Sequence, residues 1–284
     1  MKYWLAYFLA IAISTSVLPI LAQKSVVGQA EQTITVSKNG EITEIALDEY
    51  LLSAMITQSN GIENIEALKS LAVAIRSVAI SCSLYGCKHS DFALCDDSNC
   101  CIALGNTTDI DESRLTLLST ACEETRGEIL TLGSTPAMAL FCRCASKGTE
   151  ESAEYPYLVS VSESEKCEIH KLELEMDIDD ELTDKIGNIE EEAPYLVYND
   201  NEKCILAIIN KKTIDGRDLQ NALSLPSNEF VFAVDDERLI ITSHGIGHGY
   251  GLNLCGAERM ANDRFDYKSI LAFYFPKLKI NKIG

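Results

Sequence analysis

The cysteines set the first constraint on what this chain can fold into. The chain has 11 cysteines in 284 residues, and five of them fall within residues 82–101 together with a histidine. An odd number of cysteines cannot close wholly into internal disulfides, so metal ligation and free thiols both have to be considered. We therefore expect residues 82–101 to form a loop that is held by cross-links or by a metal ion.

The charge balance limits the partners. The chain carries 43 acidic and 24 basic residues, a formal net charge of −19, yet 46% of its residues are hydrophobic. That hydrophobic content is enough for a packed core, so the chain is not a disordered acidic polymer. Phosphate backbones are bound by clustered Lys and Arg, so this balance excludes nucleic acid as the main partner. It also argues against docking on an anionic membrane surface through a basic patch.

The N-terminal segment indicates export. After Lys2, residues 3–22 form a nearly continuous apolar run, and about 20 apolar residues can span a bilayer as a helix. Residues 20–22 read Ile-Leu-Ala, a poor match to the small-x-small motif of signal peptidase sites. We predict an uncleaved transmembrane anchor over residues 1–22, with a cleaved signal segment as the alternative. With Lys2 on the cytoplasmic side, the remainder lies outside, either membrane-anchored or secreted.

The rest of the chain is predicted to be a tether over residues 23–41 and one mixed α+β domain over residues 42–284. Asn64 can cap a helix whose apolar residues recur at helical spacing from Ile65 onward. Strand-like runs occupy residues 42–47, 128–132, 204–210 and 230–234. Residues 168–192 are acidic and helix-prone and are interpreted as a solvated face. No repeat and no linker between two cores is evident, which favours a single domain.

Three segments carry a family resemblance. Residues 49–52 read Glu-Tyr-Leu-Leu, and residues 66–77 read Glu-Ala-Leu-Lys-Ser-Leu-Ala-Val-Ala-Ile-Arg-Ser. Residues 212–216 read Lys-Thr-Ile-Asp-Gly, and residues 244–252 read His-Gly-Ile-Gly-His-Gly-Tyr-Gly-Leu. In their order and spacing these segments resemble the stage II sporulation protein D and amidase-enhancer family from about residue 42 to residue 280. The resemblance implies that family's mixed α+β domain.

The resemblance also implies an activity and puts it in doubt. The family's sporulation members are anchored enzymes that cut peptidoglycan glycan strands and resemble lytic transglycosylases. A single carboxylic acid protonates the glycosidic oxygen and then, as a carboxylate, withdraws a proton from the sugar's own hydroxyl. Counting between the flanking motifs places this acid at Gln58, and a carboxamide cannot deliver an acidic proton. We therefore expect impaired or absent glycan cleavage.

Two nearby carboxylates are alternatives, and further departures point the same way. Glu63 or Glu66 would have to reach the same bond, and we favour reading both as helix-start carboxylates near a positive dipole end. The family's Ala-x-Tyr-His-Ser-Ser-Ser-Gly-Gly loop is Ala-Leu-Phe-Cys-Arg-Cys-Ala-Ser-Lys over residues 139–147. In the family's Gly-Met-Ser-Gln-Trp-Gly-Ala segment, the Gln position is Leu254. These losses at sugar-facing positions suggest a relaxed or redirected function.

Four side chains are candidate substrate contacts by the same resemblance: Arg76, Ser146, His248 and Asn253. For Arg76, a buried structural ion pair is the alternative. His248 lies in a glycine-rich turn that can bring backbone amides close to a ligand, because glycine has no Cβ. A tight bend that needs positive φ explains the same glycines equally well.

The resemblance extends to a metal site. His89, Cys95, Cys100 and Cys101 form the pattern H-x5-C-x4-C-C. Some sporulation members are similar here and hold zinc with two His and two Cys, the second His being replaced in this chain by Cys100. Four protein ligands would imply a structural rather than a catalytic ion.

Alternatives to zinc stay open at this point. A disulfide or free thiols, with Cys82 and Cys87 taking part, would also account for the cysteines. Asp91 is a candidate to orient His89 from outside the ligand set. The remaining cysteines are interpreted as buried small hydrophobes or unpaired thiols.

The sequence thus predicts an exported protein with a structural zinc that binds peptidoglycan glycan strands without efficient cleavage. The alternatives are an active lytic transglycosylase acting in sporulation, and a scaffold that contacts a cell-wall amidase or sporulation membrane proteins.

Overall fold

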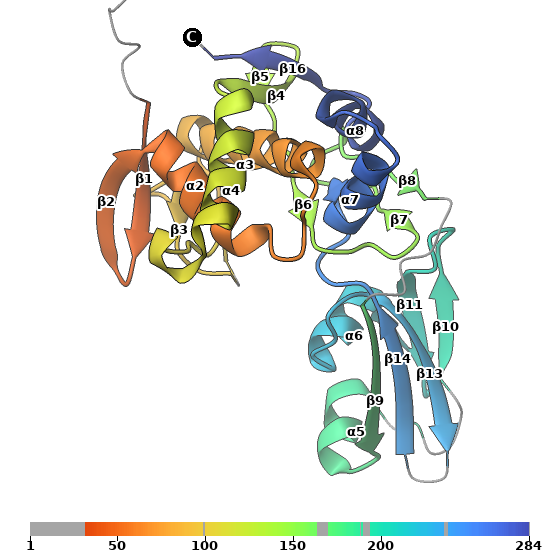
Figure 1. Cartoon of the computed structure of the whole chain (residues 1–284). Helices are drawn as coiled ribbons and strands as arrows, with labels where there is room; N and C mark the ends of the chain where they lie inside the picture. The colour runs from red at the N-terminus through yellow and green to blue at the C-terminus, as the bar shows by residue number, and fades with distance from the viewer. Residues whose placement is uncertain are drawn as a thin grey trace, which may run out of the picture.

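The structure is a computed structural model that describes residues 32–283 except 99, 164–169, 188, 190–193 and 236–237. The chain forms two lobes (Figure 1). Residues 32–163 and 245–283 make the main lobe, and residues 170–244 make the inserted lobe. The predicted anchor over residues 1–22 and residues 23–31 of the predicted tether lie outside the described residues, whereas residues 33–38 of that tether form strand β1.

The main lobe is built around helices. Its helices are α2 (Leu47–Gln58), α3 (Ile65–Tyr85), η1 (Thr107–Asp109), α4 (Glu112–Glu124), α7 (Leu254–Asn262) and α8 (Tyr267–Tyr274). Helix α3 crosses the centre, and the other α-helices, together with β4, pack around it (Figure 1).

Short strands border these helices. They are β1 (Thr33–Lys38), β2 (Glu41–Ala46), β3 (Leu94–Cys95), β4 (Glu128–Leu132), β5 (Thr135–Pro136), β6 (Phe141–Cys142), β7 (Gly148–Thr149), β8 (Val161–Ser162), β15 (Leu252–Asn253) and β16 (Lys279–Lys282). They pair in the orders β2-β1-β3, β16-β4-β5, β15-β6 and β7-β8. The pairing of β3 with β1 is parallel, and it attaches the cysteine-rich loop to the N-terminal hairpin.

The inserted lobe has two three-stranded sheets. Its elements are β9 (Lys171–Asp177), α5 (Asp180–Ile186), β10 (Tyr195–Tyr198), β11 (Cys204–Ile209), β12 (Lys212–Asp215), α6 (Gly216–Ala222), β13 (Glu229–Asp235) and β14 (Arg238–His244). The sheet orders are β10-β11-β12 and β13-β14-β9, and every pairing is antiparallel. The mixture of helices and antiparallel strands confirms the predicted α+β class.

Helix α3 is the core helix of the main lobe. The side chain of Asn64 caps it by accepting a hydrogen bond from the Glu66 amide at 3.1 Å, as predicted. Its alanines, leucines and isoleucines are buried on nearly every face. By length and hydropathy α3 is able to cross a bilayer, but 78% of its most apolar window is buried inside the protein, as in the core helix of a globular fold.

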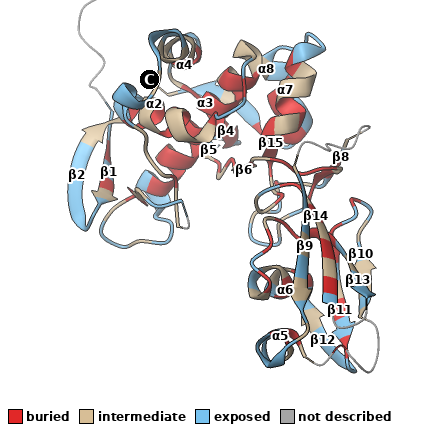
Figure 2. Cartoon of the chain, turned by 60° about the horizontal axis from the view of Figure 1, so that its bottom comes forward, coloured by how far each residue is buried: buried red, intermediate tan, exposed pale blue. Residues whose placement is uncertain are grey.

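The described residues form two separate hydrophobic clusters, although the sequence shows no linker between two cores. One surrounds α3, and the other lies between the sheets and helices of the inserted lobe, with Phe230 and Ile241 among its members. Figure 2 shows the buried residues gathered at both places. The predicted helix-prone segment 168–192 divides into β9 and α5 instead. Residues 171–177 alternate charged and apolar residues, and that period of two suits a strand.

A glycine-rich turn carries the chain from the inserted lobe back to the main lobe. Gly251 has a φ of +70°, and a Cβ there would lie 2.0 Å from the carbonyl oxygen of Leu140. Gly245 has a φ of +77°, and a Cβ there would lie 2.6 Å from the carbonyl oxygen of Cys144. Both positions therefore need glycine for backbone conformation and for close packing against residues 140–146.

Candidate functional site

Gln58, at the position that the resemblance implies for the catalytic acid, is the last residue of α2. Its side chain is half-buried, and its Nε2 donates a hydrogen bond to Thr57 Oγ1 at 3.1 Å. Thr57 Oγ1 in turn donates to the carbonyl oxygens of Ala54 and Ala103. The amide is therefore held at the end of the helix by a hydroxyl that is itself fixed between two segments.

A cavity of about 770 Å³ opens beside this helix end. Its lining comes from the end of α2, the loop that follows, the segment before η1, and the start of α4. Arg114 of α4 crosses the loop and donates to the carbonyl oxygens of Ser59 and Ile62, each at 2.7 Å. The loop after Gln58 is thus fixed in place, and the cavity walls are mostly polar.

The two alternative carboxylates differ in their freedom. Glu66 Oε1 pairs with Lys69 at 2.7 Å, and Glu66 Oε2 accepts a hydrogen bond from the Tyr267 amide at 2.8 Å. Glu63 lines the cavity, its side chain is 75% exposed, and its Oε2 lies 3.5 Å from Arg114. Both oxygens of Glu66 are therefore engaged by other groups, whereas the carboxylate of Glu63 is exposed at the cavity and contacts Arg114.

The four predicted metal ligands come together in space. The donor atoms of His89, Cys95, Cys100 and Cys101 all lie within 4.8 Å of one another, and all four residues are partly buried. His89 Nε2 is 3.4 Å from the sulfurs of Cys100 and Cys101, and those two sulfurs are 3.9 Å apart. In tetrahedral zinc coordination, sulfurs are about 3.8 Å apart and a sulfur and a nitrogen about 3.5 Å apart. The donor set therefore fits one tetrahedral zinc ion.

The chemistry of the thiols agrees with a cation site. Burial, reinforced by the neighbouring sulfurs of Cys101 and Cys100, raises the pKa of the Cys95 thiol to about 12. Burial also raises the pKa of the Cys101 thiol, and a bound cation would favour the thiolate form of both residues. The cation would be held by His89, Cys95, Cys100 and Cys101. These four ligands would leave no coordination position open to water or substrate.

The loop that carries these ligands is braced against α2. The amide of Gly105 donates to the carbonyl oxygen of Ser53 at 2.9 Å. A Cβ at Gly105 would lie 2.4 Å from Cγ2 of Ile56, so the loop approaches the helix more closely than a side chain allows. Together with the Thr57–Ala103 hydrogen bond, these contacts join the cysteine loop to the helix that ends at Gln58.

Residues around the metal ligands have roles that the sequence only partly indicated. The His89 ring stacks on Phe92 with centroids 4.3 Å apart, a partner that sequence reasoning missed. Asp91, the predicted orienting residue, instead accepts a hydrogen bond from Ser90. Asp96 Oδ1 accepts from the Leu104 amide at 2.6 Å, and its other oxygen pairs with Lys38. The acidic residue after the first cysteine thus shapes the loop.

Arg76, a predicted substrate contact, lies inside the main lobe and is 1% exposed. Its guanidinium donates to the carbonyl oxygens of Cys122, Thr125 and Glu128 at 2.8–3.2 Å. It therefore caps the end of α4 and the start of β4, and no ligand reaches it. The alternative of a buried structural role fits, although the partners are backbone carbonyls and not a carboxylate.

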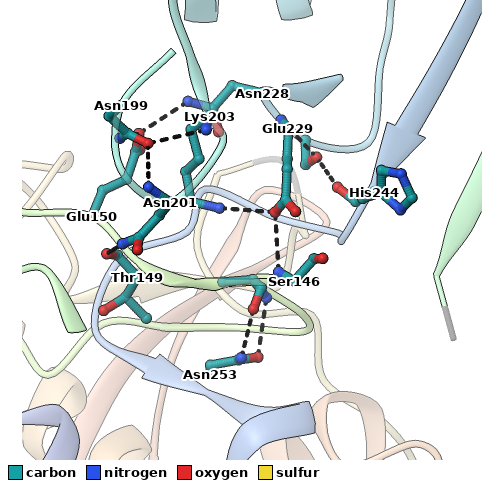
Figure 3. A network of polar contacts seen from close by, with 12 residues as sticks. Ser146, Thr149, Glu150, Asn199, Asn201, Lys203, Asn228, Glu229, His244 and Asn253 are labelled. Atoms are coloured by element: carbon teal, nitrogen blue, oxygen red, sulfur yellow. Dashed lines mark hydrogen bonds and ion pairs between the residues drawn. The ribbon is translucent and has the colours of Figure 1, made fainter. Parts of the chain in front are cut away.

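Ser146 and Asn253 are also fully buried, at the seam between the lobes (Figure 3). Asn253 forms two hydrogen bonds with the backbone of Ala145, and the Ser146 amide donates to Glu229 Oε2 at 3.0 Å. Both predicted contacts are corrected in the same way. The Asn253 side chain and the Ser146 backbone amide position the turn of residues 144–147, while the Ser146 hydroxyl is buried without a hydrogen-bond partner among the described residues. Neither side chain is at a surface that a glycan reaches.

His248 is the fourth predicted contact, and the structure places it within the glycine-rich turn. Its Nδ1 accepts a hydrogen bond from the Tyr250 amide at 3.0 Å, and the two rings stack with centroids 5.5 Å apart. Burial, together with the nearby Arg217, lowers the pKa of His248 to about 4. The imidazole is therefore neutral at physiological pH and is no proton donor there.

Sequence reasoning missed the polar network that joins the lobes. Lys203 and Glu229 form an ion pair at 3.2 Å with side chains that are 1% and 2% exposed (Figure 3). Beside it, Glu150 Oε1 accepts from Asn199 and Asn228, each at 3.2 Å, and Glu150 also pairs with Arg217. The residues are far apart in sequence, so no local pattern signals the network.

The fold and the site together define a two-lobed α+β protein with a cysteine–histidine loop braced against the helix that ends at Gln58. Residues 35–132 match the family described as "Stage II sporulation protein". Stage II sporulation protein D of Bacillus subtilis is 26% identical over 269 residues, which cover 86% of this chain and 77% of that protein. The protein of the same name from Bacillus amyloliquefaciens is 23% identical over 271 residues, covering 87% of this chain and 77% of that protein.

A third relative matches a shorter region. An uncharacterized protein of Brachyspira hyodysenteriae is 41% identical over 70 residues, which cover 24% of this chain and 19% of that protein. The chain is thus similar to stage II sporulation protein D over most of its length, and its residues 35–132 match the family model.

Proposed function

We propose that this chain is an exported sporulation protein that binds peptidoglycan glycan strands and cleaves them poorly or not at all. The observation that carries the proposal is the carboxamide of Gln58 at the position where the family pattern has a Glu. Residues 1–22 would anchor the chain in the membrane or direct its secretion, and the two lobes would face the cell wall.

The expected loss of activity follows from the chemistry of the reaction. Breaking a glycosidic bond without water needs one group that first gives and then takes a proton. General acid–base catalysis contributes roughly 10²- to 10⁴-fold, or about 3–5 kcal/mol of the activation barrier. An amide can orient a sugar hydroxyl by hydrogen bonding, but it does neither proton transfer. With Gln58 at this position, the chain can still hydrogen-bond a glycan but lacks the proton transfer that cleavage needs.

The two neighbouring carboxylates differ in how they bear on this proposal. Glu66 has both oxygens engaged by Lys69 and by the Tyr267 amide, so a change of role would break α3's link to α8. Glu63 is exposed and lines the cavity beside α2. This single observation favours the second candidate function, an active lytic transglycosylase in which Glu63 replaces the missing acid.

We also propose a structural zinc at His89, Cys95, Cys100 and Cys101. The four donors would fill a tetrahedral site and leave no position for substrate or water. The ion would order residues 89–105 and, through the contacts of Gly105 and Thr57, the end of α2. Its contribution is therefore to the shape of the cavity and not to the reaction.

The test uses insoluble cell-wall sacculi with the full chain. The proposal predicts that the protein sediments with the sacculi and that no 1,6-anhydro muropeptides appear in the supernatant. Soluble 1,6-anhydro products from the wild type that disappear in Glu63→Gln would establish the enzyme with a displaced acid. Protein that stays in solution but is retained by a cell-wall amidase or a sporulation membrane protein would overturn glycan binding and indicate a scaffold.

A matched pair of variants makes the test specific. Glu63→Gln removes the carboxyl that would act as the displaced acid. Glu258→Gln, on α7, is the control: this carboxylate accepts hydrogen bonds from the backbone amides of Glu63 and Asn64. If both variants bind sacculi as the wild type does, binding does not depend on either carboxylate.

A further inference from the structure

A disulfide lies at the start of the cysteine loop. It joins Cys82, in the last turn of α3, to Cys87, with the two Cα atoms 5.0 Å apart. Cys82 is 2% exposed within the main core, whereas Cys87 is exposed. Met138 Sδ contacts both sulfurs, at 3.8 Å and 3.9 Å. The disulfide therefore ties a surface loop directly to the core helix.

The segment that follows the disulfide has few other attachments. The Gly86 amide donates to the Cys82 carbonyl, and the next backbone–backbone hydrogen bond is from Ala93 to Thr35. Between these two points, residues 87–92 form none with the described part of the chain. The ammonium of Lys88 donates to the Cys100 carbonyl at 2.5 Å. His89 thus sits on a short strap whose first fixed end is the disulfide.

The last turn of α3 would not replace that fixed end. Its residues 83–85 are all exposed, and Leu84 and Tyr85 are 61% and 62% exposed. A helix end without buried side chains frays readily, because nothing but its own hydrogen bonds holds it. Without the disulfide, the loosely held segment would therefore be longer, beginning near Cys82 and ending at Ala93.

We propose that the Cys82–Cys87 disulfide is a redox-accessible clamp on the metal site. Closed, it holds His89 close to the three thiols; opened by a dithiol reductant, it lets the strap loosen and the metal leave more easily. The proposal rests on the metal site proposed above. It adds a point of control that the ligands alone do not have, because none of the four takes part in the disulfide.

The exchange step has one accessible sulfur. A thiolate of the reductant attacks Cys87 Sγ, since Cys82 Sγ is buried, and the bond between the two protein sulfurs breaks. Cys82 leaves as a thiolate and takes up a proton, while Cys87 is held in a mixed disulfide. The second thiol of the reductant then attacks the reductant sulfur of this mixed disulfide. Cys87 is released and takes up a proton to become a thiol. Two electrons and two protons pass to the protein, and the dithiol becomes a disulfide.

The loosened strap weakens metal binding because metal ions bind the ordered loop and not the disordered one. The free energy of ordering the extra residues is then taken from that of metal binding. Groups that hold a ligand in place from outside the coordination sphere typically change metal affinity by 10- to 100-fold. We expect an effect of that size on the rate of metal loss.

The test follows Zn²⁺ transfer from the full chain to a chromophoric chelator, before and after a phosphine reductant. Alkylation and mass spectrometry first establish which thiols are free. Reduction is expected to speed Zn²⁺ transfer roughly 10-fold or more. Cys87→Ser is expected to lose Zn²⁺ at the fast rate without reductant and to show no further change with it. Cys122→Ala, which alters a thiol outside the loop, should behave as the wild type.

The outcomes separate the two proposals. A chain that binds no Zn²⁺ overturns the metal site and the clamp together. Zn²⁺ loss at one rate, with the disulfide shown by mass to be cleaved, overturns the clamp and leaves the metal site standing. Free Cys82 and Cys87 thiols in the zinc-loaded protein also overturn the clamp. If Cys87→Ser does not fold, the wild type with and without phosphine decides the question alone.

Discussion

The cysteine loop and the seam between the lobes both contain the residues that the sequence marked as functional, but they use them differently. In the loop, four donors converge within 4.8 Å of one another, and their arrangement suits an ion. At the seam, Ser146 and Asn253 are fully buried and hydrogen-bonded to protein groups. The loop therefore brings its donor atoms to a common point, whereas at the seam the Asn253 amide and the Ser146 backbone amide help to hold the fold together.

The comparison shows how the motifs of a family are to be read in a distantly similar chain. A set of ligands is defined by their mutual distances, so it can be recognised while one His is exchanged for a Cys. A substrate contact needs an accessible side chain as well as the right residue type. A buried residue can therefore match the motif without being able to touch a substrate. Arg76, retained in the family helix, is the clearest case, since its guanidinium serves three backbone carbonyls.

The largest effect is expected from breaking the cysteine loop. Cys95→Ser should reduce zinc from about one ion per chain to well below that and lower the free energy of unfolding by several kcal/mol, because structural zinc binding contributes to folding. Metal analysis and urea unfolding measure the two quantities. Cys122→Ser, outside the loop, is the control and should keep the metal. Equal zinc in the two variants would contradict the ligand assignment.

The next effect tests whether the seam is structural. Lys203→Met leaves Glu229 as an unpaired buried charge and should lower the free energy of unfolding by about 3–5 kcal/mol. Adding Glu229→Gln removes that charge and should recover most of the lost stability. The Ser146 amide would then donate to the weaker acceptor of the Gln side chain. Urea unfolding of the wild type and both variants measures this. A single variant as stable as the wild type would mean that the seam does not depend on the pair.

A smaller effect is expected where the cysteine loop meets α2. Gly105→Ala places a Cβ 2.4 Å from Ile56 Cγ2, and overpacking of this kind costs about 1–3 kcal/mol. We expect the upper part of that range, with weaker Zn²⁺ retention, because the displaced loop carries the ligands. Ile56→Ala in the same chain makes room and should recover the metal. If the double variant is no better, the contact does not couple the loop to the helix.

The smallest effect concerns pH. In the folded protein the pKa of His248 is lowered to about 4 from its usual 6.5, so below pH 6.5 the unfolded chain takes up a proton that the folded chain does not. The free energy of unfolding should therefore fall by about 2 kcal/mol between about pH 7.5 and pH 5, and the fall should level off below about pH 4. His248→Gln should flatten this part of the pH dependence. The same slope in variant and wild type would show that His248 is not buried as a neutral group.

Local patterns predicted the elements of this fold better than their assembly. The Asn64 cap, the helix after it and the strand Glu128–Leu132 follow from capping and periodicity, and the structure has them. The two-core organisation was missed because the turn that joins the lobes is held by backbone contacts, such as that of Gly251 with Leu140, which no composition signal marks. Charge also obscured β9, whose alternation was overlooked within an acidic run.

The clustering of His89, Cys95, Cys100 and Cys101 was predictable, because all four residues lie within one short loop. The burial of Arg76, Ser146 and Asn253 was not, because it depends on segments far away in the sequence. The sequence offers a disulfide as an alternative to a metal site, whereas in the structure Cys82 and Cys87 form a disulfide and the four predicted ligands lie outside it.

The most direct test is the muropeptide digest of the wild type beside Gln58→Glu, both free of other hydrolases. The account predicts no 1,6-anhydro product from the wild type. It predicts that Gln58→Glu releases 1,6-anhydro product at a rate roughly 10²-fold or more above the wild-type background, because the carboxyl restores proton transfer. Rapid release of 1,6-anhydro ends by the wild type would contradict the central claim that this chain lacks its proton donor.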